Sequence, residues 1–201
     1  MASKGKLSEY DVAVGALYKI TRNRRNPDEL WRDICTPLAE HATDQTIALV
    51  FSSAVEQSLE AAISTHFVLD DDGCARMFNL PNDMAPIGIF AAKISLGYAL
   101  GIYEQHIRDE LKLIKAIRNA FAHATSEVDF ANDKIGAACA CLWLPTKLKD
   151  AGKLDRQEDW DTKERYMTSA KFLFLYLDDP DRGIKPKRFA TSHFYDVLRK
   201  P

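Results

Sequence analysis

An arginine, an asparagine and a histidine stand close together in the stretch Ile117-Arg118-Asn119-Ala120-Phe121-Ala122-His123. A histidine can take the proton from a ribose 2′-hydroxyl as a general base, while an arginine holds the charge that gathers on the phosphate. An asparagine beside the arginine can orient the phosphate or fix the histidine tautomer. These residue types suit cleavage of RNA without a metal, with His123 as the base and Arg118 as the phosphate clamp.

The spacing of apolar residues predicts a helix over residues 103–122 that carries this stretch at its end. At about 100° per residue, Arg118 falls inside the apolar side of that helix, so its guanidinium needs a partner. Asn119 and His123 lie about 100° to 140° further round. Arg118 and His123 can converge only if the helix unwinds before His123, or if a second copy of the chain lies alongside. The spacing therefore predicts a site at a helix end or at the twofold axis of a homodimer.

The same residues have a structural interpretation. Arg118 can bond to loop carbonyls or to a carboxylate such as Glu56 or Glu60, and a histidine in a last turn is stabilised by the negative helix end. A binding surface for a protein or an RNA is a third interpretation. Composition and spacing alone favour the structural roles.

The other elements that must position this helix are also predicted to be helical. A helix is expected from Asp44 to about Phe67. Its apolar face is so wide that more than one neighbouring helix must cover it, and we therefore expect it to be the central helix. A helix that begins near Asn26 is expected to stop or kink near Pro37, and Asp70 to Gly73 are expected to form a polar turn. Further helices are expected over residues 8–24, 74–79, 89–101 and 132–144 (stopped by Pro145), with a charged linker over 146–162. Periodicity does not decide between helix and strand for the apolar run in residues 166–177, which we take as a helix.

Length and composition set the class of protein. The chain has 201 residues, 46% hydrophobic and 28% charged, which suffices for one well-buried core. With only 9 Gly and 8 Pro, a turn-rich β-fold is disfavoured, and we expect an all-α, single-domain helical bundle. A net charge of −2 argues against bulk electrostatic coating of nucleic acid. No apolar run reaches the roughly 20 residues of a membrane span and no secretory signal is visible, so a cytoplasmic protein is expected.

Neither the cysteines nor the acidic turn predicts a metal site. Cys35, Cys74, Cys139 and Cys141 lack a zinc spacing and are expected to be reduced, small, buried side chains. If Gly73 is taken as the glycine of a calcium loop, Val68 and Asn79 fall where acidic ligands are required. We therefore expect no metal and no cofactor.

Three blocks of the sequence resemble the mannitol operon repressor (MtlR) family. They are Thr43-Asp44-Gln45-Thr46-Ile47-Ala48-Leu49-Val50, the stretch from Pro86 to Ile102, and the stretch from Ile114 to His123. The family pattern joins a Phe, a Lys and Tyr-Ala-Leu-Gly to a later Ile-Arg-Asn and Phe-Ala-His, which Phe90, Lys93, Tyr98 to Gly101 and Ile117 to His123 match. The first block departs from the family's Asp-Arg-Gly, because Gln45 and Thr46 follow Asp44.

The resemblance implies an all-helical, dimeric, cytoplasmic protein that represses transcription through protein partners, without a DNA-reading helix of its own. A transcription or sugar-transport component is the expected partner. Lys93, Arg118, Asn119 and His123 are the expected partner- or RNA-binding residues. Within this interpretation the chain divides into N-terminal helices over 1–40, the MtlR-like core over 41–145 and a C-terminal extension over 146–201.

The motif Arg118-Asn119-x-x-x-His123 also resembles the signature of HEPN ribonucleases, which are helical dimers whose motifs meet across the interface. This resemblance implies a metal-independent endoribonuclease or a toxin-like RNA-binding protein as the alternative, with Arg118 and His123 catalytic. A non-catalytic helical interaction module is the second alternative.

Overall fold

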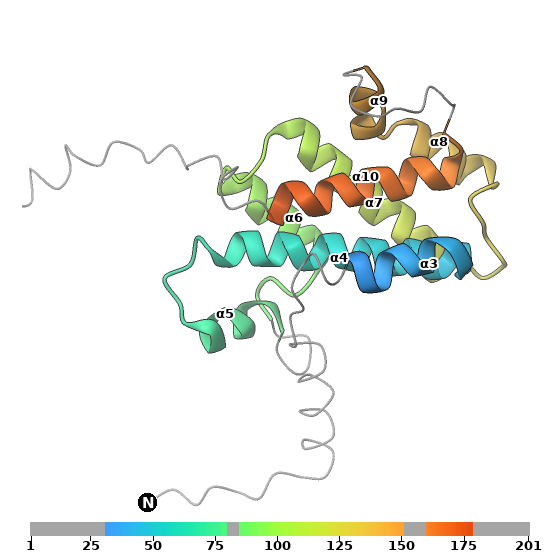
Figure 1. Cartoon of the computed structure of the whole chain (residues 1–201). Coiled ribbons are helices and arrows are strands. Elements are labelled where there is room, and N and C mark those ends of the chain that lie inside the picture. Colours follow the sequence, from blue (N-terminus) through green and yellow to red (C-terminus); the bar gives the residue numbers. More distant parts are fainter. Residues whose placement is uncertain (1–30, 80–84, 151–159, 179–201) are drawn as a thin grey trace, which may run out of the picture.

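The computed structural model describes residues 31–79, 85–150 and 160–178. These residues form eight α-helices and one π-helical turn, with no strand among them, which confirms the expected all-α, single-domain fold (Figure 1). The elements in chain order are the π-helical turn Trp31–Cys35, α3 Thr36–His41, α4 Asp44–Ser64, α5 Asp71–Phe78, α6 Phe90–Ala99, α7 Gln105–His123, α8 Asp133–Ala140, α9 Trp143–Asp150 and α10 Thr162–Asp178.

Helix α4 is the centre of the bundle. It packs against α3, α6, α7 and α10, and α10 lies alongside it over much of its length (Figure 1). Its start is capped by the side chain of Thr43, which accepts a hydrogen bond from the backbone N–H of Thr46. The side chains of α4 that are buried on its several faces are Ile47, Ala48, Phe51, Ser52, Ala54, Val55, Ser58, Leu59, Glu60 and Ile63. The wide apolar face predicted for this helix is thus covered by several neighbours.

The turn between α6 and α7 depends on two glycines of the Pro86–Ile102 block. A Cβ on Gly97 would lie 2.8 Å from the ring of Tyr103, whose hydroxyl donates a 2.6 Å hydrogen bond to the carbonyl of Ile94. Gly101 has a φ of 71°, a left-handed conformation that favours glycine after a helix end. These residues set how α7 leaves α6, and therefore where its far end lies.

Pro37 was expected to stop or kink a helix, and the preceding π-helical turn does end at Cys35, two residues before it. Pro145 was expected to stop a helix and does not. Pro37 lies in the first turn of α3, which continues to His41. Pro145 lies in the first turn of α9, after α8 has already ended at Ala140. Proline is tolerated there because the first N–H groups of a helix have no intrahelical acceptor to bond. Residues 146–150 of the expected linker are therefore helical.

The acidic stretch at Asp70 was also assigned incorrectly. Asp70 is the N-cap of α5 and accepts a hydrogen bond from the N–H of Gly73, and Asp71 and Asp72 form the first turn. Acidic residues at this end are stabilised by the helix dipole. In contrast, the helix expected over 166–177 is confirmed by α10. The helix expected over 8–24 lies outside the described residues.

Cys35, Cys74 and Cys139 are buried and Cys141 is exposed, all as free thiols. Within the described ranges, no helix has the length and apolar character that a bilayer span requires.

Candidate functional site

Arg118 and Asn119 meet near the end of α7. Arg118 Nη1 donates a 3.1 Å hydrogen bond to Asn119 Oδ1, and both residues are partly buried. Arg118 also lies near Tyr166 of α10: burial raises the pKa of that phenol, and the charge of Arg118 offsets this only in part. The sequence-based alternative that Arg118 bonds to Glu56 or Glu60 is wrong, because Lys93 holds both carboxylates.

His123 is the last residue of α7 and is exposed. The helix keeps its α-helical form through this residue, so the route in which it unwinds before His123 is wrong. Five positions of an α-helix turn the side chain by about 140°. Arg118 and His123 of one chain are therefore not brought together, and their convergence across a homodimer stays a prediction.

Lys93 lies apart from this motif, in the interface between α6 and α4. Its ammonium group is 2.8 Å from Glu56 Oε1 and 3.2 Å from Glu60 Oε2, and it lies 5.8 Å from the ring centre of Phe78. Only 6% of the side chain is exposed. Because buried charges require partners, the structure assigns Lys93 to the joint between two helices.

A cleft of about 350 Å³ opens where the start of α4 meets the end of α7. Its lining comes from both helices and from the loop after α7, namely Thr43, Asp44, Gln45, Phe121, Ala124, Ser126, Glu127, Val128 and Asp129. Gln45 Nε2 donates a 3.1 Å hydrogen bond to the carbonyl of Phe121, one of the last carbonyls of α7. Gln45, one of the two residues at which the sequence departs from the MtlR pattern, thus joins two walls of the cleft.

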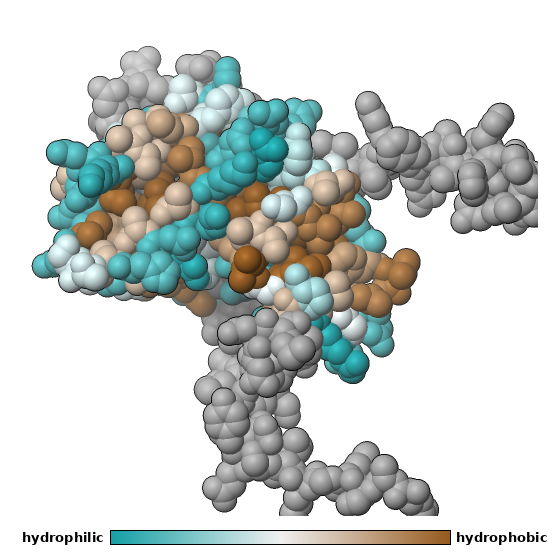
Figure 2. Space-filling model, turned by 180° about the vertical axis from the view of Figure 1, so that it is seen from behind, coloured by the Kyte–Doolittle hydropathy of each residue, from teal (hydrophilic) through white to brown (hydrophobic). Residues whose placement is uncertain are grey.

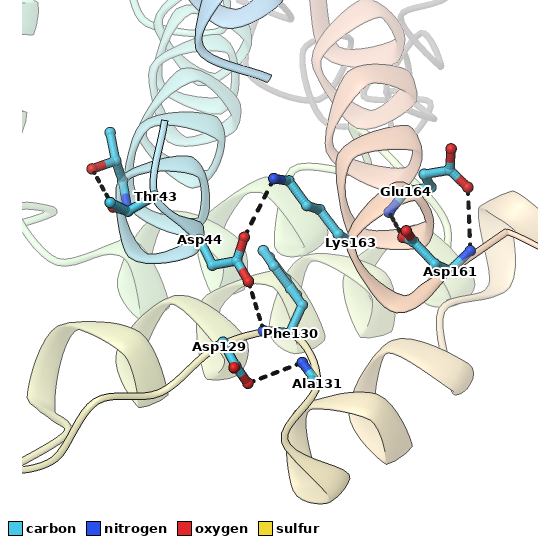
Figure 3. A network of polar contacts seen from close by, with 9 residues as sticks. Thr43, Asp44, Asp129, Phe130, Ala131, Asp161, Lys163 and Glu164 are labelled. Carbon is cyan, nitrogen blue, oxygen red and sulfur yellow. Dashed lines mark hydrogen bonds and ion pairs between the residues drawn. The ribbon is translucent and has the colours of Figure 1, made fainter. Parts of the chain in front are cut away.

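Asp44 joins three segments beside this cleft (Figure 3). Its Oδ2 accepts a 3.0 Å hydrogen bond from the N–H of Phe130, and its Oδ1 lies 3.3 Å from Lys163 Nζ of α10. Helix α10 starts next to this pair with reciprocal hydrogen bonds between Asp161 and Glu164 (Figure 3). Both oxygens of Asp44 are therefore engaged in structural contacts.

Among the described residues, no group of three or more His, Cys, Asp or Glu side chains could hold a metal ion.

A second polar cluster, which the sequence interpretation missed, fixes α9 and α10 against α7. Glu110 is 1% exposed and accepts hydrogen bonds from the N–H groups of Trp143 and Leu144 and from the hydroxyl of Ser169. Burial raises its pKa above the ordinary value, although these donors lower it. Its spacing of three from Ile107 and four from Ile114 places it on the apolar side of α7, a signal that would have found it.

Arg165 completes this cluster from α10. It donates hydrogen bonds to the carbonyls of Cys139, Ala140 and Leu142, where α8 has ended and α9 is about to begin. Carbonyls in the last turn of a helix have no N–H donor within that helix, so the guanidinium is a suitable donor for those of Cys139 and Ala140. Glu110 and Arg165 therefore support the fold from the side of α7 that faces the core.

One solved structure shares this fold. A chain in the X-ray structure of the MtlR-HPr complex from Escherichia coli aligns with a TM-score of 0.55 and 18% sequence identity, covering 75% of this chain and 99% of that one. No family model and no curated protein matches the sequence.

Proposed function

We propose that this protein is an MtlR-like transcriptional regulator that represses through protein partners. The observation that carries the proposal is the shared fold with nearly the whole of a chain from the MtlR-HPr complex, which is itself an assembly of proteins. The three sequence blocks that resemble the MtlR family support it independently. The protein would act as a homodimer in the cytoplasm, with a transcription or sugar-transport component as its partner.

The positions of the matched residues fit a shared frame that presents a binding surface. Four of the matched residues are buried in the packing of α6 and α7, namely Phe90, Lys93, Ile117 and Phe121. Others are exposed, among them Tyr98 after the middle of α6 and His123 at the end of α7, and Asn119 is partly buried. We therefore propose that the buried residues of these blocks determine the fold and that exposed residues of α7 bind the partner.

Binding to HPr is the direct test of the regulator proposal. Isothermal titration calorimetry of the purified protein with HPr from the same organism should show saturable heat at a stoichiometry of one per protomer. In parallel, pull-downs from lysate should recover a transcription or sugar-transport component with the wild-type protein. If HPr gives no heat and neither kind of component is recovered, the regulator proposal is wrong.

The ribonuclease alternative is favoured by one observation, the exposed imidazole of His123 at the end of the same helix that carries Arg118. It needs a second copy to place Arg118 of one chain beside His123 of the other. Incubation of the purified protein with single-stranded RNA in EDTA tests it. Cleavage that His123→Ala abolishes, with the melting temperature kept within a few degrees, would establish the enzyme. Intact RNA after prolonged incubation would dismiss it.

A further inference from the structure

One side of α7 carries cationic side chains and faces away from the core. Arg108, Lys112, Lys115, Asn119 and His123, which we call the α7 basic face, follow one another at spacings of four, three, four and four. At about 100° per residue they fall within roughly 80° of arc. The buried residues of α7 lie on the other side of the helix, and they are Ile107, Glu110, Leu111, Ile114, Ile117 and Phe121. Lys112 and His123 are exposed, and the other three are partly buried.

The charge of this face is positive although the chain as a whole has a net charge of −2. Asp109 is the acidic side chain within reach, 3.1 Å from Arg108 Nη2 and 3.6 Å from Lys112 Nζ. Among the described residues, no salt bridge involves Lys115. Arg108 and Lys112 share the carboxylate of Asp109, and Lys115 has no such partner among the described residues. The positive charge of the face is therefore incompletely neutralised and is available to an acidic ligand.

Two partly exposed aromatic rings lie beside the first turns of α7, one against the α7 basic face and one against His106, about 100° further round the helix. Tyr98 of α6 is 38% exposed, and the guanidinium of Arg108 lies 4.4 Å from its ring centre. Trp143 of α9 is 37% exposed, and its ring centre lies 4.3 Å from that of His106. Figure 2, which shows the molecule from behind, has a hydrophilic band running diagonally between two hydrophobic areas. Cations between apolar flanks form a mixed surface of the kind found in protein interfaces.

We infer that the α7 basic face, together with Tyr98 and Trp143, is the docking surface for an acidic segment of a protein partner. Charge complementarity selects an acidic ligand. The aromatic flanks and the arginine, residue types enriched at protein–protein hot spots, favour a protein over a nucleic acid. The overall negative charge also disfavours a long polyanion. This inference rests on the proposed function, since it names the surface through which a protein-binding regulator would meet its partner.

A peptide of four Glu-Glu-Leu repeats, labelled with fluorescein, is a probe of this surface. Fluorescence anisotropy at low salt should show saturable binding to the full-length protein, and the affinity should fall as NaCl screens the charges. The Lys112→Glu, Lys115→Glu double variant should bind about tenfold more weakly or worse, because it reverses two charges of the face. Lys134→Glu with Lys171→Glu, which reverses two exposed lysines on α8 and α10, should change the affinity less than twofold. Circular dichroism melting should show that both double variants are folded.

The inference is overturned if the peptide does not bind, if both double variants lose affinity equally, or if a 12-nucleotide oligouridylate binds more tightly than the peptide.

Trp143→Ala offers a second measurement, because it removes an apolar side chain without changing the charge. It should weaken binding of the peptide while leaving the salt dependence of binding unaltered. HPr separates this inference from the proposed function. If HPr binds the wild type and the Lys112, Lys115 double variant equally well and the peptide does not bind, the regulator proposal holds and the docking surface is wrong. If the peptide binds as expected but neither HPr nor a partner from the lysate binds, the docking surface holds and the regulator proposal is wrong.

Discussion

Lys93 and Glu56 form a 2.8 Å ion pair between α6 and α4 in which only 6% and 19% of their side chains are exposed. Glu60, one turn further along α4, lies 3.2 Å from the same ammonium group. One buried ammonium group thus bridges two carboxylates in a helix interface. The pattern Phe90, Lys93, Tyr98 that resembles the MtlR family therefore contains a lysine whose position is explained by packing.

Removing this cation should destabilise the protein strongly. Lys93→Met keeps most of the side-chain volume but removes the buried positive charge that contacts both Glu56 and Glu60. We expect a loss of about 3–5 kcal/mol in the free energy of unfolding, measured by urea denaturation at neutral pH. Lys171→Met, at an exposed position of α10, should cost about 0.5 kcal/mol or less. Equal losses in the two variants would contradict the role assigned to Lys93.

Gly97 should tolerate no side chain. In Gly97→Ala the new Cβ would lie 2.8 Å from Tyr103 and 3.1 Å from Leu59 Cδ1, so α6 or the tyrosine must shift. We expect a loss of about 1–3 kcal/mol from overpacking. Gly136→Ala in α8 is the matched control, because the nearest atom to its Cβ is 3.8 Å away, and it should instead gain about 0.5–1 kcal/mol. Thermal melting of the two variants checks the opposite signs.

Glu110→Gln should destabilise the joint between α7 and α9. The carboxylate accepts from three donors, and an amide would turn an NH₂ group toward at least one of them. We expect a loss of about 1–3 kcal/mol at neutral pH, measured by urea denaturation.

The pH dependence of the free energy of unfolding, compared between wild type and Glu110→Gln, supplies a second measurement. Because burial raises the pKa of Glu110 in the folded state, its proton is bound more tightly there than in the unfolded chain. Its contribution to stability is then fully present below the ordinary pKa of about 4.5 and declines as the pH rises through the folded pKa. The stability difference between wild type and Glu110→Gln should accordingly shrink from pH 4.5 toward neutrality. A difference that grows with pH would show that the hydrogen bonds outweigh burial.

Asp44 and Lys163 should contribute unequally, although they form one ion pair. Asp44→Ala removes the acceptor of the Phe130 N–H as well as the charge, so we expect a loss of about 1–3 kcal/mol. Lys163→Ala leaves that hydrogen bond intact and removes only a partly exposed ion pair, which is worth about 0–1 kcal/mol. Chemical denaturation of both variants decides this, and a larger loss at Lys163 would contradict it.

Periodicity predicted α4 and α7 because their apolar residues recur every three or four positions over several turns. It did not distinguish helix from strand for the apolar run of α10. Helix ends were harder to predict. A proline such as Pro37 or Pro145 fits the first turn of a helix as well as the position after its end, and only the neighbouring elements decide between the two. Asp70 was similarly ambiguous, since a cap residue is also a turn residue.

The candidate site shows where sequence reasoning ends. A helical wheel correctly placed Arg118 beside the apolar side of α7, yet it could not say which carboxylates were free to meet it. Glu56 and Glu60 are taken by Lys93, a competition that depends on how α6 lies on α4. The contact between Gln45 and Phe121 joins residues 76 positions apart and has no local signature.

The pairing of α10 with α4 has a consequence for how the chain is made. About a hundred residues separate the two helices, so α4 leaves the ribosome long before its neighbour has been translated. Until then the residues of α4 that α10 will cover, such as Ala48, whose carbonyl accepts the hydrogen bond of Tyr166, remain open to water and to other nascent chains. Folding of this bundle cannot be completed before α10 has been translated, and a chaperone that shields the emerging α4 would raise the yield of native protein.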